Sequence, residues 1–297
     1  GASDIDGLSD CLVENNSIWL GNDPSGTTSA ANMNVAVGTT ALDALTTGDY
    51  NVAIGYNAMT ATDVGTESVG IGHKALETQT DGYYNVALGS YACQNLTSGY
   101  NNVALGSGAM RATTTALSNT AVGHWALSAV TTQGGNTMVG YLAGQDLAAS
   151  GNTLIGCEAG LQNTSGADNT AVGNSAMGAG ITTGACNVAV GNSALNSNTT
   201  SGANVAIGYN AAGAVTTGDA RITAVGFRAL EAVTSGTQNT AMGQYAANLI
   251  ETGSYNTCVG AYAGNVVTTG HQNICIGQNT DPSAADGTQQ IVIGGGI

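Results

Sequence analysis

The chain has 297 residues, of which 42% are hydrophobic and only 8% are charged, an apolar fraction too high for a disordered protein. Nineteen acidic residues against four basic ones give a net charge of −15, which argues against binding nucleic acid or an anionic membrane through a basic patch. No apolar run approaches the roughly 20 residues of a membrane-spanning helix, so no membrane insertion is expected.

The chain begins with a segment that carries no repeat. Residues 1–16 form an acidic leader, and residues 17–297 form a repeat domain. The terminal repeats of that domain are atypical, since Trp19 stands where later repeats have Ala, and the only two prolines lie in the first and last full repeats. Proline cannot donate to a hydrogen-bonded ladder, which suits it to the ends of a stack. The acidic residues of the leader are Asp4, Asp6, Asp10 and Glu14.

A five-residue motif of Asn, apolar, small, apolar and Gly returns along the chain with a regular period. We number each repeat from the residue four before the Gly, so that the Gly is position five. Most successive position-five glycines have the spacing of Gly38 and Gly55, and the few exceptions differ from it by one. Such a short fixed period indicates units that stack on their neighbours to bury their apolar faces. The position-five glycines are Gly21, Gly38, Gly55, Gly72, Gly89, Gly106, Gly123, Gly140, Gly156, Gly173, Gly191, Gly208, Gly226, Gly243, Gly260, Gly277 and Gly294.

Each repeat is expected to contain two short strands and two turns. Positions two and four hold mostly branched apolar residues around a small position three, which predicts a strand with apolar groups on both faces. We expect the branched face to fill the core and the Ala face to meet a close neighbour. A nearly invariant Ala at position eight marks the second strand. The fold class predicted is therefore all-β, a parallel β-solenoid or β-roll of about 16 coils with a 17-residue repeat.

Asn occupies position one in 13 of the 16 repeats from Asn34 onward. Stacked in register, its side-chain amides can form a hydrogen-bonded ladder and cap the turn backbone. We prefer this structural interpretation to ligand binding.

The six cysteines form no recognisable framework, and CxxC and Cys/His metal spacings are absent. Cys258 and Cys275 share position three in adjacent repeats. Neighbouring coils would place their Cα atoms ~4.8 Å apart, within disulfide range. A bridge and a pair of packed thiols are both compatible with this spacing.

The repeats resemble two families of fibrous proteins. They are similar to the head repeats of YadA-type trimeric autotransporter adhesins and to the shafts of phage and viral tail fibres. The resemblance implies a parallel β-roll that forms a homotrimer through its small-residue strand, on a virion or outside a cell. Its partners would be further copies of the chain, also end to end, and a glycan or protein receptor on a host surface. The runs that carry the resemblance are Asn51-Val52-Ala53-Ile54-Gly55 and Asn204-Val205-Ala206-Ile207-Gly208.

A structural or adhesive fibre segment that presents a host-contact surface is therefore the expected function. Exposed tyrosines can stack on sugars or on protein surfaces, and packing between neighbouring coils or chains is the alternative that we prefer. The two further functions considered are an ice-binding solenoid, prompted by Thr-rich turns, and a tailspike that cleaves glycans with paired acids. The tyrosines of the expected contact surface are Tyr50, Tyr83, Tyr84 and Tyr100.

We expect no enzyme activity, no cofactor and no metal. His73, His124 and His271 are scattered along the repeats, and no catalytic triad order, HExxH motif or phosphate-binding loop can be defended. His73 and His124 lie three coils apart, about 14 Å along the stack, too far to share one metal within a chain. The sequence therefore names no catalytic, cofactor-binding or metal-binding residue.

Overall fold

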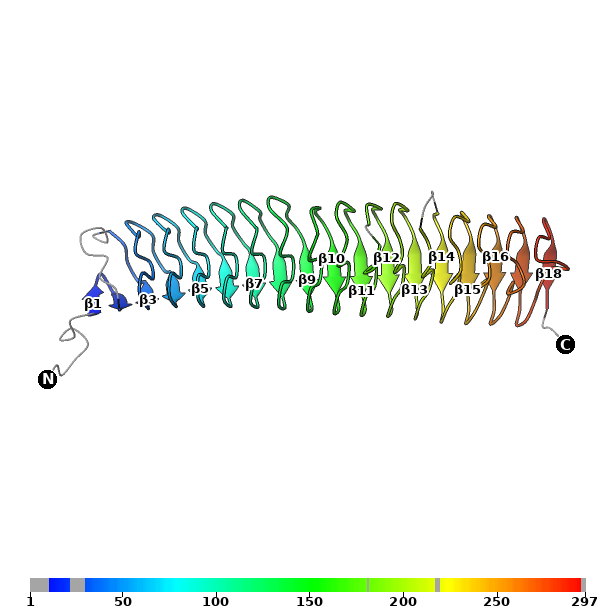
Figure 1. Cartoon of the computed structure of the whole chain (residues 1–297), viewed down its shortest axis with the longest axis horizontal. Coiled ribbons are helices and arrows are strands. Elements are labelled where there is room, and N and C mark those ends of the chain that lie inside the picture. The colour runs from blue at the N-terminus through cyan, green and yellow to red at the C-terminus, as the bar shows by residue number, and fades with distance from the viewer. Residues whose placement is uncertain (1–10, 22–29, 181, 217–219, 295–297) are drawn as a thin grey trace. The chain divides into compact units, whose positions relative to one another are not determined.

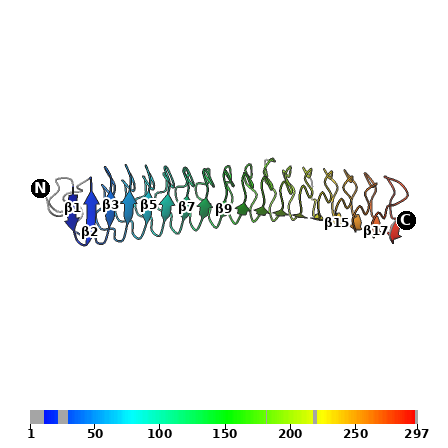
Figure 2. The ribbon, with the colours of Figure 1, turned by 90° about the horizontal axis from the view of Figure 1, so that it is seen from below.

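The computed structural model describes residues 11–21, 30–180, 182–216 and 220–294. The chain is an all-β parallel β-solenoid of about 16 turns, and its described residues contain no helix. Two compact units make up the chain, residues 1–142 (unit 1) and residues 143–297 (unit 2). Within each unit the strands of successive turns lie side by side (Figures 1 and 2). The predicted fold class is confirmed.

The strands of unit 1 pair in register, one repeat apart. Val52 lies opposite Val69, and Val69 lies opposite Val86 in the following turn. β1 differs, because it pairs antiparallel with β2 and so begins the stack with a hairpin. The described part of the predicted leader is thus joined to the first repeat. The strands are β1 (Cys11–Glu14), β2 (Ser17–Leu20), β3 (Val35–Val37), β4 (Val52–Ile54), β5 (Val69–Ile71), β6 (Val86–Leu88), β7 (Val103–Leu105), β8 (Thr120–Val122) and β9 (Thr137–Val139).

The strands of unit 2 are parallel throughout. Ala189 lies opposite Ala206, and Cys258 lies opposite Cys275. The turns that are one residue longer than usual keep the same strand register, so the extra residues fall in the loops. The strands are β10 (Thr153–Ile155), β11 (Thr170–Val172), β12 (Val188–Val190), β13 (Val205–Ile207), β14 (Thr223–Val225), β15 (Thr240–Met242), β16 (Thr257–Val259), β17 (Ile274–Ile276) and β18 (Ile291–Ile293).

Each repeat contributes one strand, and the predicted second strand at position eight is wrong. Lys74 and Leu76, which flank the position-eight Ala75, have φ angles of 59° and 52°. A β-strand needs negative φ, so this segment is a series of turns. Positive φ at non-glycine residues recurs at positions seven and nine and at the residue just before position one, here called the pre-strand position.

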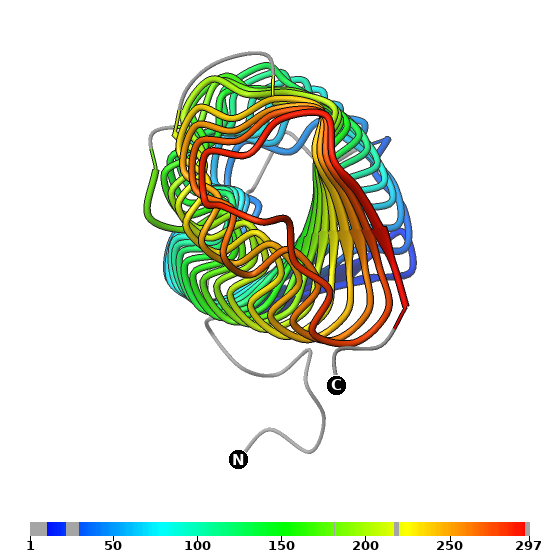
Figure 3. The same cartoon turned by 90° about the vertical axis from the view of Figure 1, so that its right-hand side faces the viewer.

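Position three points into the turn, and positions two and four point outward. In β6, Ala87 is fully buried whereas Leu88 is 47% exposed. The expectation that branched side chains fill the core and that the Ala face meets another chain is therefore wrong. Seen end-on in Figure 3, each turn of the chain closes on itself. The interior of so narrow a turn is limited at normal packing density, so the side chain at position three is small in most turns.

Position nine lies across the interior from position three, and the sizes of the two side chains are matched. Many turns combine Ala at position three with Leu or Met at position nine, as in Ala121 and Leu127, both fully buried. Where Leu154 occupies position three, position nine is Gly160, and a Cβ on that glycine would lie 2.5 Å from Cδ1 of Leu154. The interior of such a turn has room for one large side chain.

The position-five Gly allows neighbouring turns to approach closely. Gly89 has a φ of 138°, and a Cβ at this residue would lie 2.6 Å from the carbonyl carbon of Gly106 in the next turn. Any larger residue would be strained by its φ and would collide with backbone atoms. Close stacking of the turns therefore requires glycine at position five.

The position-one asparagines form the predicted hydrogen-bonded ladder. Asn34 Oδ1 accepts the backbone N–H of Asn51 at 2.8 Å, which joins one turn to the next. Asn51 Nδ2 donates to the carbonyl oxygen of Gly65 at 2.7 Å, which ties the start of a turn to its end. Both asparagines are fully buried, so these bonds satisfy polar groups that would be costly to leave unpaired. The structural interpretation of position one is confirmed.

We predict that Leu154 and Gly160 compensate each other. Leu154→Ala leaves a cavity and should lower the free energy of unfolding by about 2 to 5 kcal/mol. Gly160→Leu alone should be destabilising because two large side chains then compete for one space. The double variant restores the pairing of Ala with Leu found in other turns and should recover most of the loss, as measured by chemical denaturation.

Ala189 and Leu195 already have the common pairing and provide the control. Leu195→Gly alone should be destabilising, and combining it with Leu154→Ala should give additive losses because the two turns are not neighbours. Additive losses in the Leu154 and Gly160 pair would instead show that the two positions do not share a space.

Candidate functional site

The outward side chains of the strands form an uncharged and mostly apolar surface in each unit, here called the strand face. It consists of positions two and four of β2–β9 in unit 1 and of β10–β18 in unit 2. These positions hold only Val, Ile, Leu, Met and Thr. Leu88 in unit 1 and Met242 in unit 2 are each 47% exposed. Large uncharged apolar surfaces of this kind mark interaction sites in soluble proteins.

Three of the four tyrosines predicted as a contact surface lie together in unit 1. Tyr83 and Tyr100 stack with ring centroids 4.9 Å apart and an interplanar angle of 3°, and Tyr84 packs edge-on against Tyr83 at 5.3 Å. The stacked rings cover one face of each other, which leaves less ring surface for a sugar. For Tyr83 and Tyr100 the geometry supports the preferred alternative, packing between neighbouring turns.

Tyr50 does not belong to this cluster. It occupies the pre-strand position before β4, Glu67 occupies the same position before β5, and Tyr84 follows before β6. Tyr50 is 54% exposed, and no other ring of the described residues packs against it. Tyr50, Glu67 and Val69 line a hollow of about 500 Å³. The hollow lies where the pre-strand position borders the strand face.

A second series of rings follows positions six and seven, after the Gly. His73 stacks on Tyr56 with centroids 5.7 Å apart, and His124 stacks on Tyr141 at 5.8 Å. Both histidines thus contribute to ring packing between adjacent turns. Unit 2 has an equivalent series in which the pairs are Tyr209 with Phe227 at 5.2 Å and Tyr245 with Tyr262 at 5.1 Å.

Two arginines lie against this series of rings. The guanidinium carbon of Arg111 is 4.8 Å from the ring centroid of Tyr91 and 5.6 Å from that of Trp125. In unit 2 the guanidinium of Arg228 is 5.8 Å from the ring of Phe227. These distances are typical of cation–π contacts. The sequence analysis missed them, although Tyr91 and Trp125 share position seven two repeats apart, which is the signal that was present.

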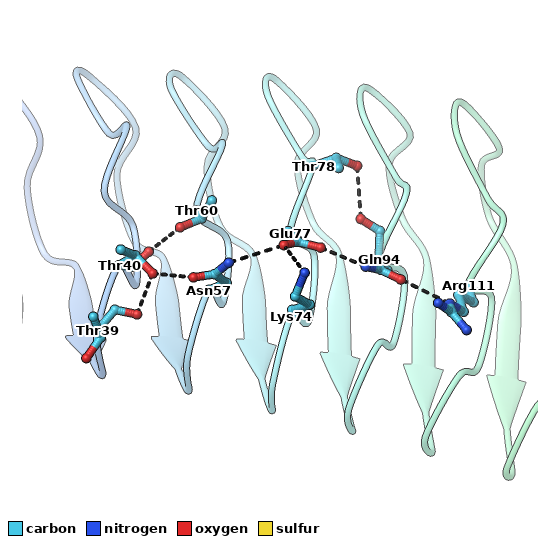
Figure 4. A network of polar contacts seen from close by, with 9 residues as sticks. All are labelled: Thr39, Thr40, Asn57, Thr60, Lys74, Glu77, Thr78, Gln94 and Arg111. Carbon is cyan, nitrogen blue, oxygen red and sulfur yellow. Dashed lines mark hydrogen bonds and ion pairs between the residues drawn. The ribbon is translucent and has the colours of Figure 1, made fainter.

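A ladder of polar side chains crosses successive turns of unit 1 (Figure 4). Glu77 is at its centre, with Lys74 Nζ 2.9 Å from its Oε1. Asn57 Nδ2 donates to the same oxygen at 3.3 Å, and Gln94 Nε2 donates to Oε2 at 2.7 Å. Arg111 Nε extends the ladder by donating to Gln94 Oε1 at 3.0 Å. One carboxylate thus organises polar side chains from several turns.

The ladder shifts the pKa of both charged partners. Partial burial raises the pKa of Glu77, but hydrogen bonds from Gln94, Lys74 and Asn57 outweigh this effect and hold the pKa below its ordinary value. The hydrogen bond to Glu77 raises the pKa of Lys74. Lys74 pairs with Glu77 and Arg111 donates to Gln94, so the ladder links successive turns and stabilises the stack.

Hydroxyl groups in the Thr-rich turns bond to the next turn. Thr97 Oγ1 donates to the carbonyl oxygen of Thr114 at 3.1 Å, and Thr114 Oγ1 donates to that of Thr131 at 3.2 Å. Hydroxyls used in this way do not present a free array to an ice lattice. The ice-binding alternative stays a prediction, and these contacts do not favour it.

Cys258 and Cys275 are paired in register as free, fully buried thiols. A hydrogen bond to Cys275 and burial together raise the pKa of the Cys258 thiol. A Cβ on Gly264 would lie 2.3 Å from Cys258 Sγ, so the cysteine occupies space that a glycine leaves open. Burial likewise raises the pKa of Cys93 to about 12. These thiols act as small apolar filling.

The described parts of the chain contain no group of three or more His, Cys, Asp or Glu side chains that could hold a metal ion. Within the same residues, no helix has the length and apolar character needed to cross a bilayer.

We predict that Glu77 makes stability depend on pH in the acid range. Because its pKa is lowered from 4.5 in the folded chain, its contribution should be complete above about pH 4.5 and should disappear as the pH falls through the folded pKa. Glu77→Gln should therefore lower stability at pH 7 by about 1 kcal/mol and have little effect at the lowest pH. Thermal unfolding of both proteins across this range measures the difference.

Glu251→Gln is the matched control, since no described side chain bonds to the Glu251 carboxylate and its backbone oxygen would be retained. The control should remain close to the wild-type protein at every pH. A constant difference between Glu77→Gln and the wild type across the range would contradict a role for the Glu77 charge.

Comparisons with known proteins were made over the whole chain. No family model matches it, no curated protein matches it, and no solved structure matches it. The parallel β-solenoid therefore follows from the structure of the chain itself.

Proposed function

We propose that the chain is a segment of a structural or adhesive fibre, a homotrimer that presents a host-contact surface outside a cell or on a virion. The observation that carries this proposal is the strand face. In each unit, every turn contributes outward Val, Ile, Leu, Met or Thr side chains to one uncharged surface. In a fibre of associated chains, the strand face of every turn would contact another chain.

The strand face offers self-association an extended surface in each unit. Eight strands of unit 1, spaced ~4.8 Å apart, carry side chains over a width of about 10 Å, which gives an apolar surface of roughly 400 Å². Unit 2 adds a similar surface on β10–β18. Covering such a stripe with other copies of the chain removes it from water. The number of chains, three, comes from the family resemblance.

The surface of association differs from the one that the sequence suggested. Ala87 and Ala206 are fully buried inside their own turns and cannot contact another chain. Leu88 and Ile207, the next residues, point outward and are exposed. The homotrimer is therefore proposed to form through positions two and four, and not through the small-residue columns.

The distribution of sequence variation between the repeats supports a non-catalytic function. Interior positions repeat Asn, Ala and Gly, and most of the variation falls on outward side chains such as Tyr50, Glu67 and Tyr84. The two histidines of unit 1 are engaged in ring stacking, and Glu77 is engaged in a ladder. These two histidines and Glu77 thus have structural partners, which supports a surface for contact.

Self-association through the strand face predicts a specific effect of charge. The intact protein should have the mass of three chains in size-exclusion chromatography with light scattering. Leu88→Glu should shift it towards the monomer, because each assembly would bury three unpaired carboxylates at a cost of several kcal/mol. Circular dichroism should remain unchanged, since Leu88 lies outside the core.

Ser98→Glu is the control, because it adds the same charge at an exposed turn away from the strand face. It should leave the mass unchanged. A monodisperse monomer of the unaltered protein would refute the homotrimer.

Contact with a host surface is tested through the tyrosine cluster. Tyr83→Ala combined with Tyr84→Ala should reduce binding to host cells or to a glycan array by about tenfold, because it removes aromatic contact surface and loosens Tyr100. Tyr255→Ala, an exposed tyrosine at the pre-strand position of unit 2, is the control. Equal binding by the wild type, the double variant and the control would show that Tyr83 and Tyr84 serve only in packing. Turnover of a bound glycan would contradict the non-catalytic proposal.

A further inference from the structure

The pre-strand residues before β4, β5 and β6 place a carboxylate between two tyrosines. Tyr50, Glu67 and Tyr84 occupy the same position in three successive turns and have φ angles of 60°, 52° and 55°. The backbone N–H of Glu67 donates to the carbonyl oxygen of Asp49 at 2.9 Å, and that of Tyr84 donates to Thr66 at 3.3 Å. Their spacing is therefore fixed by the stacking of the turns.

The surroundings of Glu67 lack a positive charge. Glu67 is exposed, and no described side chain donates a hydrogen bond to its carboxylate. The two basic residues described in unit 1 have other partners: Lys74 pairs with Glu77, and Arg111 lies against Tyr91 and Trp125. The net charge of the chain, −15, also attracts cations. The carboxylate is available to a cation from outside the chain.

The hollow beside Glu67 combines this charge with apolar and aromatic surface. Tyr50 and Val69 line it together with Glu67, and its volume is about 500 Å³. Tyr50 is 54% exposed and Tyr84 is 49% exposed. Tyr84 is held by its edge-on contact with Tyr83, which is itself stacked on Tyr100. The second ring of the pair is thus positioned by its neighbours.

The same chain shows that two rings at this spacing accept a cation. Trp125 follows Tyr91 by two repeats at one repeat position, and Tyr84 follows Tyr50 by two repeats in the same way. The Arg111 guanidinium carbon lies 4.8 Å from one ring of the first pair and 5.6 Å from the other. The residue between Tyr91 and Trp125 in their column is Gly108, whereas the residue between Tyr50 and Tyr84 is Glu67. A cation at the second pair would therefore meet a carboxylate as well as the rings, and no arginine of the described residues lies there.

We propose that Tyr50, Glu67 and Tyr84 form a binding site for a quaternary ammonium group of the choline type. Aromatic faces attract such cations through their quadrupole, and the methyl groups of a quaternary ammonium suit rings and an apolar side chain such as Val69. Glu67 neutralises the charge without needing a hydrogen-bond donor on the ligand. This site rests on the proposed function, since it assigns a ligand class to the host-contact surface.

The site lies at the border of the strand face and is compatible with the proposed assembly. Position four, which includes the exposed Ile54 and Leu88, is four residues from the pre-strand position, about 13 Å along an extended chain. Val69, which lines the hollow, belongs to the strand face at position two, so the proposed contact between chains borders the hollow and leaves Tyr50, Glu67 and Tyr84 at its edge. Binding is therefore to be measured on the full chain in its assembled state.

The experiment is a titration of the full chain with choline, tetramethylammonium and methylammonium, followed by saturation-transfer NMR. Choline and tetramethylammonium should bind, and methylammonium should bind about fivefold more weakly. The neutral isostere 3,3-dimethylbutan-1-ol should bind more weakly than choline by a similar factor. Glu67→Gln, Tyr50→Leu and Tyr84→Leu should each weaken choline binding about two- to fivefold, as expected for exposed cation–π and ionic contacts.

Two variants in unit 2 are matched controls at the pre-strand position. Asp168→Asn removes an exposed acid whose neighbours in that position are Gly151 and Cys186, and Tyr255→Leu removes an exposed tyrosine between Gln238 and Gln272. Neither should change choline binding. Equal effects of the control and site variants, no binding of choline, or equal binding of the neutral isostere or methylammonium would overturn the proposed site.

The result is separable from the test of the proposed function. Loss of host binding in the Tyr83 and Tyr84 double variant without any choline binding would overturn the ammonium site alone. Choline binding that responds to Glu67→Gln, together with host binding that is insensitive to the tyrosines, would uphold the ligand site and refute the host-contact function.

Discussion

Hydrogen bonding between successive turns is the constraint on which the rest of this structure depends. The backbone N–H of Val52 donates to Ser68 at 2.9 Å, and that of Val69 donates to Asn85 at 2.8 Å, so equivalent residues are kept in register. The sequence repeat then becomes a set of columns that rise by ~4.8 Å per turn. Residues at the same repeat position therefore lie next to one another in successive turns, and their packing, hydrogen bonds and charges recur along the column.

The same constraint makes the interior strict. Because adjacent turns are so close, the position-five Gly cannot carry a side chain, and the inner side of each turn cannot hold two large ones. Leu154 opposite Gly160 and Ala121 opposite Leu127 both place one large and one small residue inside the turn. The turns between the strands tolerate positive φ at residues such as Leu76 because the hydrogen bonds on each side over-determine their conformation.

On the surface, register decides which groups are free. Two rings in the same column of adjacent turns stack and cover each other, as Tyr83 and Tyr100 do. Rings two turns apart do not stack on each other: Arg111 lies against both Tyr91 and Trp125, and Glu67 stands between Tyr50 and Tyr84. Rings in adjacent turns of one column therefore pack against each other, whereas rings two turns apart keep faces that can contact another group.

The sequence alone determined the period, the parallel stacking of turns and the role of the position-one asparagines, because each follows from a pattern repeated along the chain. It could not determine which face of the strand points inward. Ala87 and its outward neighbour Leu88 are both apolar, so alternation by itself allows either orientation, and only closure of a narrow turn selects the smaller residue for the inside. It also placed Tyr50 with Tyr83, Tyr84 and Tyr100 on residue type. Only the tertiary structure showed that Tyr83 and Tyr100 cover each other and that Tyr50 and Tyr84 are exposed, because ring contacts depend on how successive turns align.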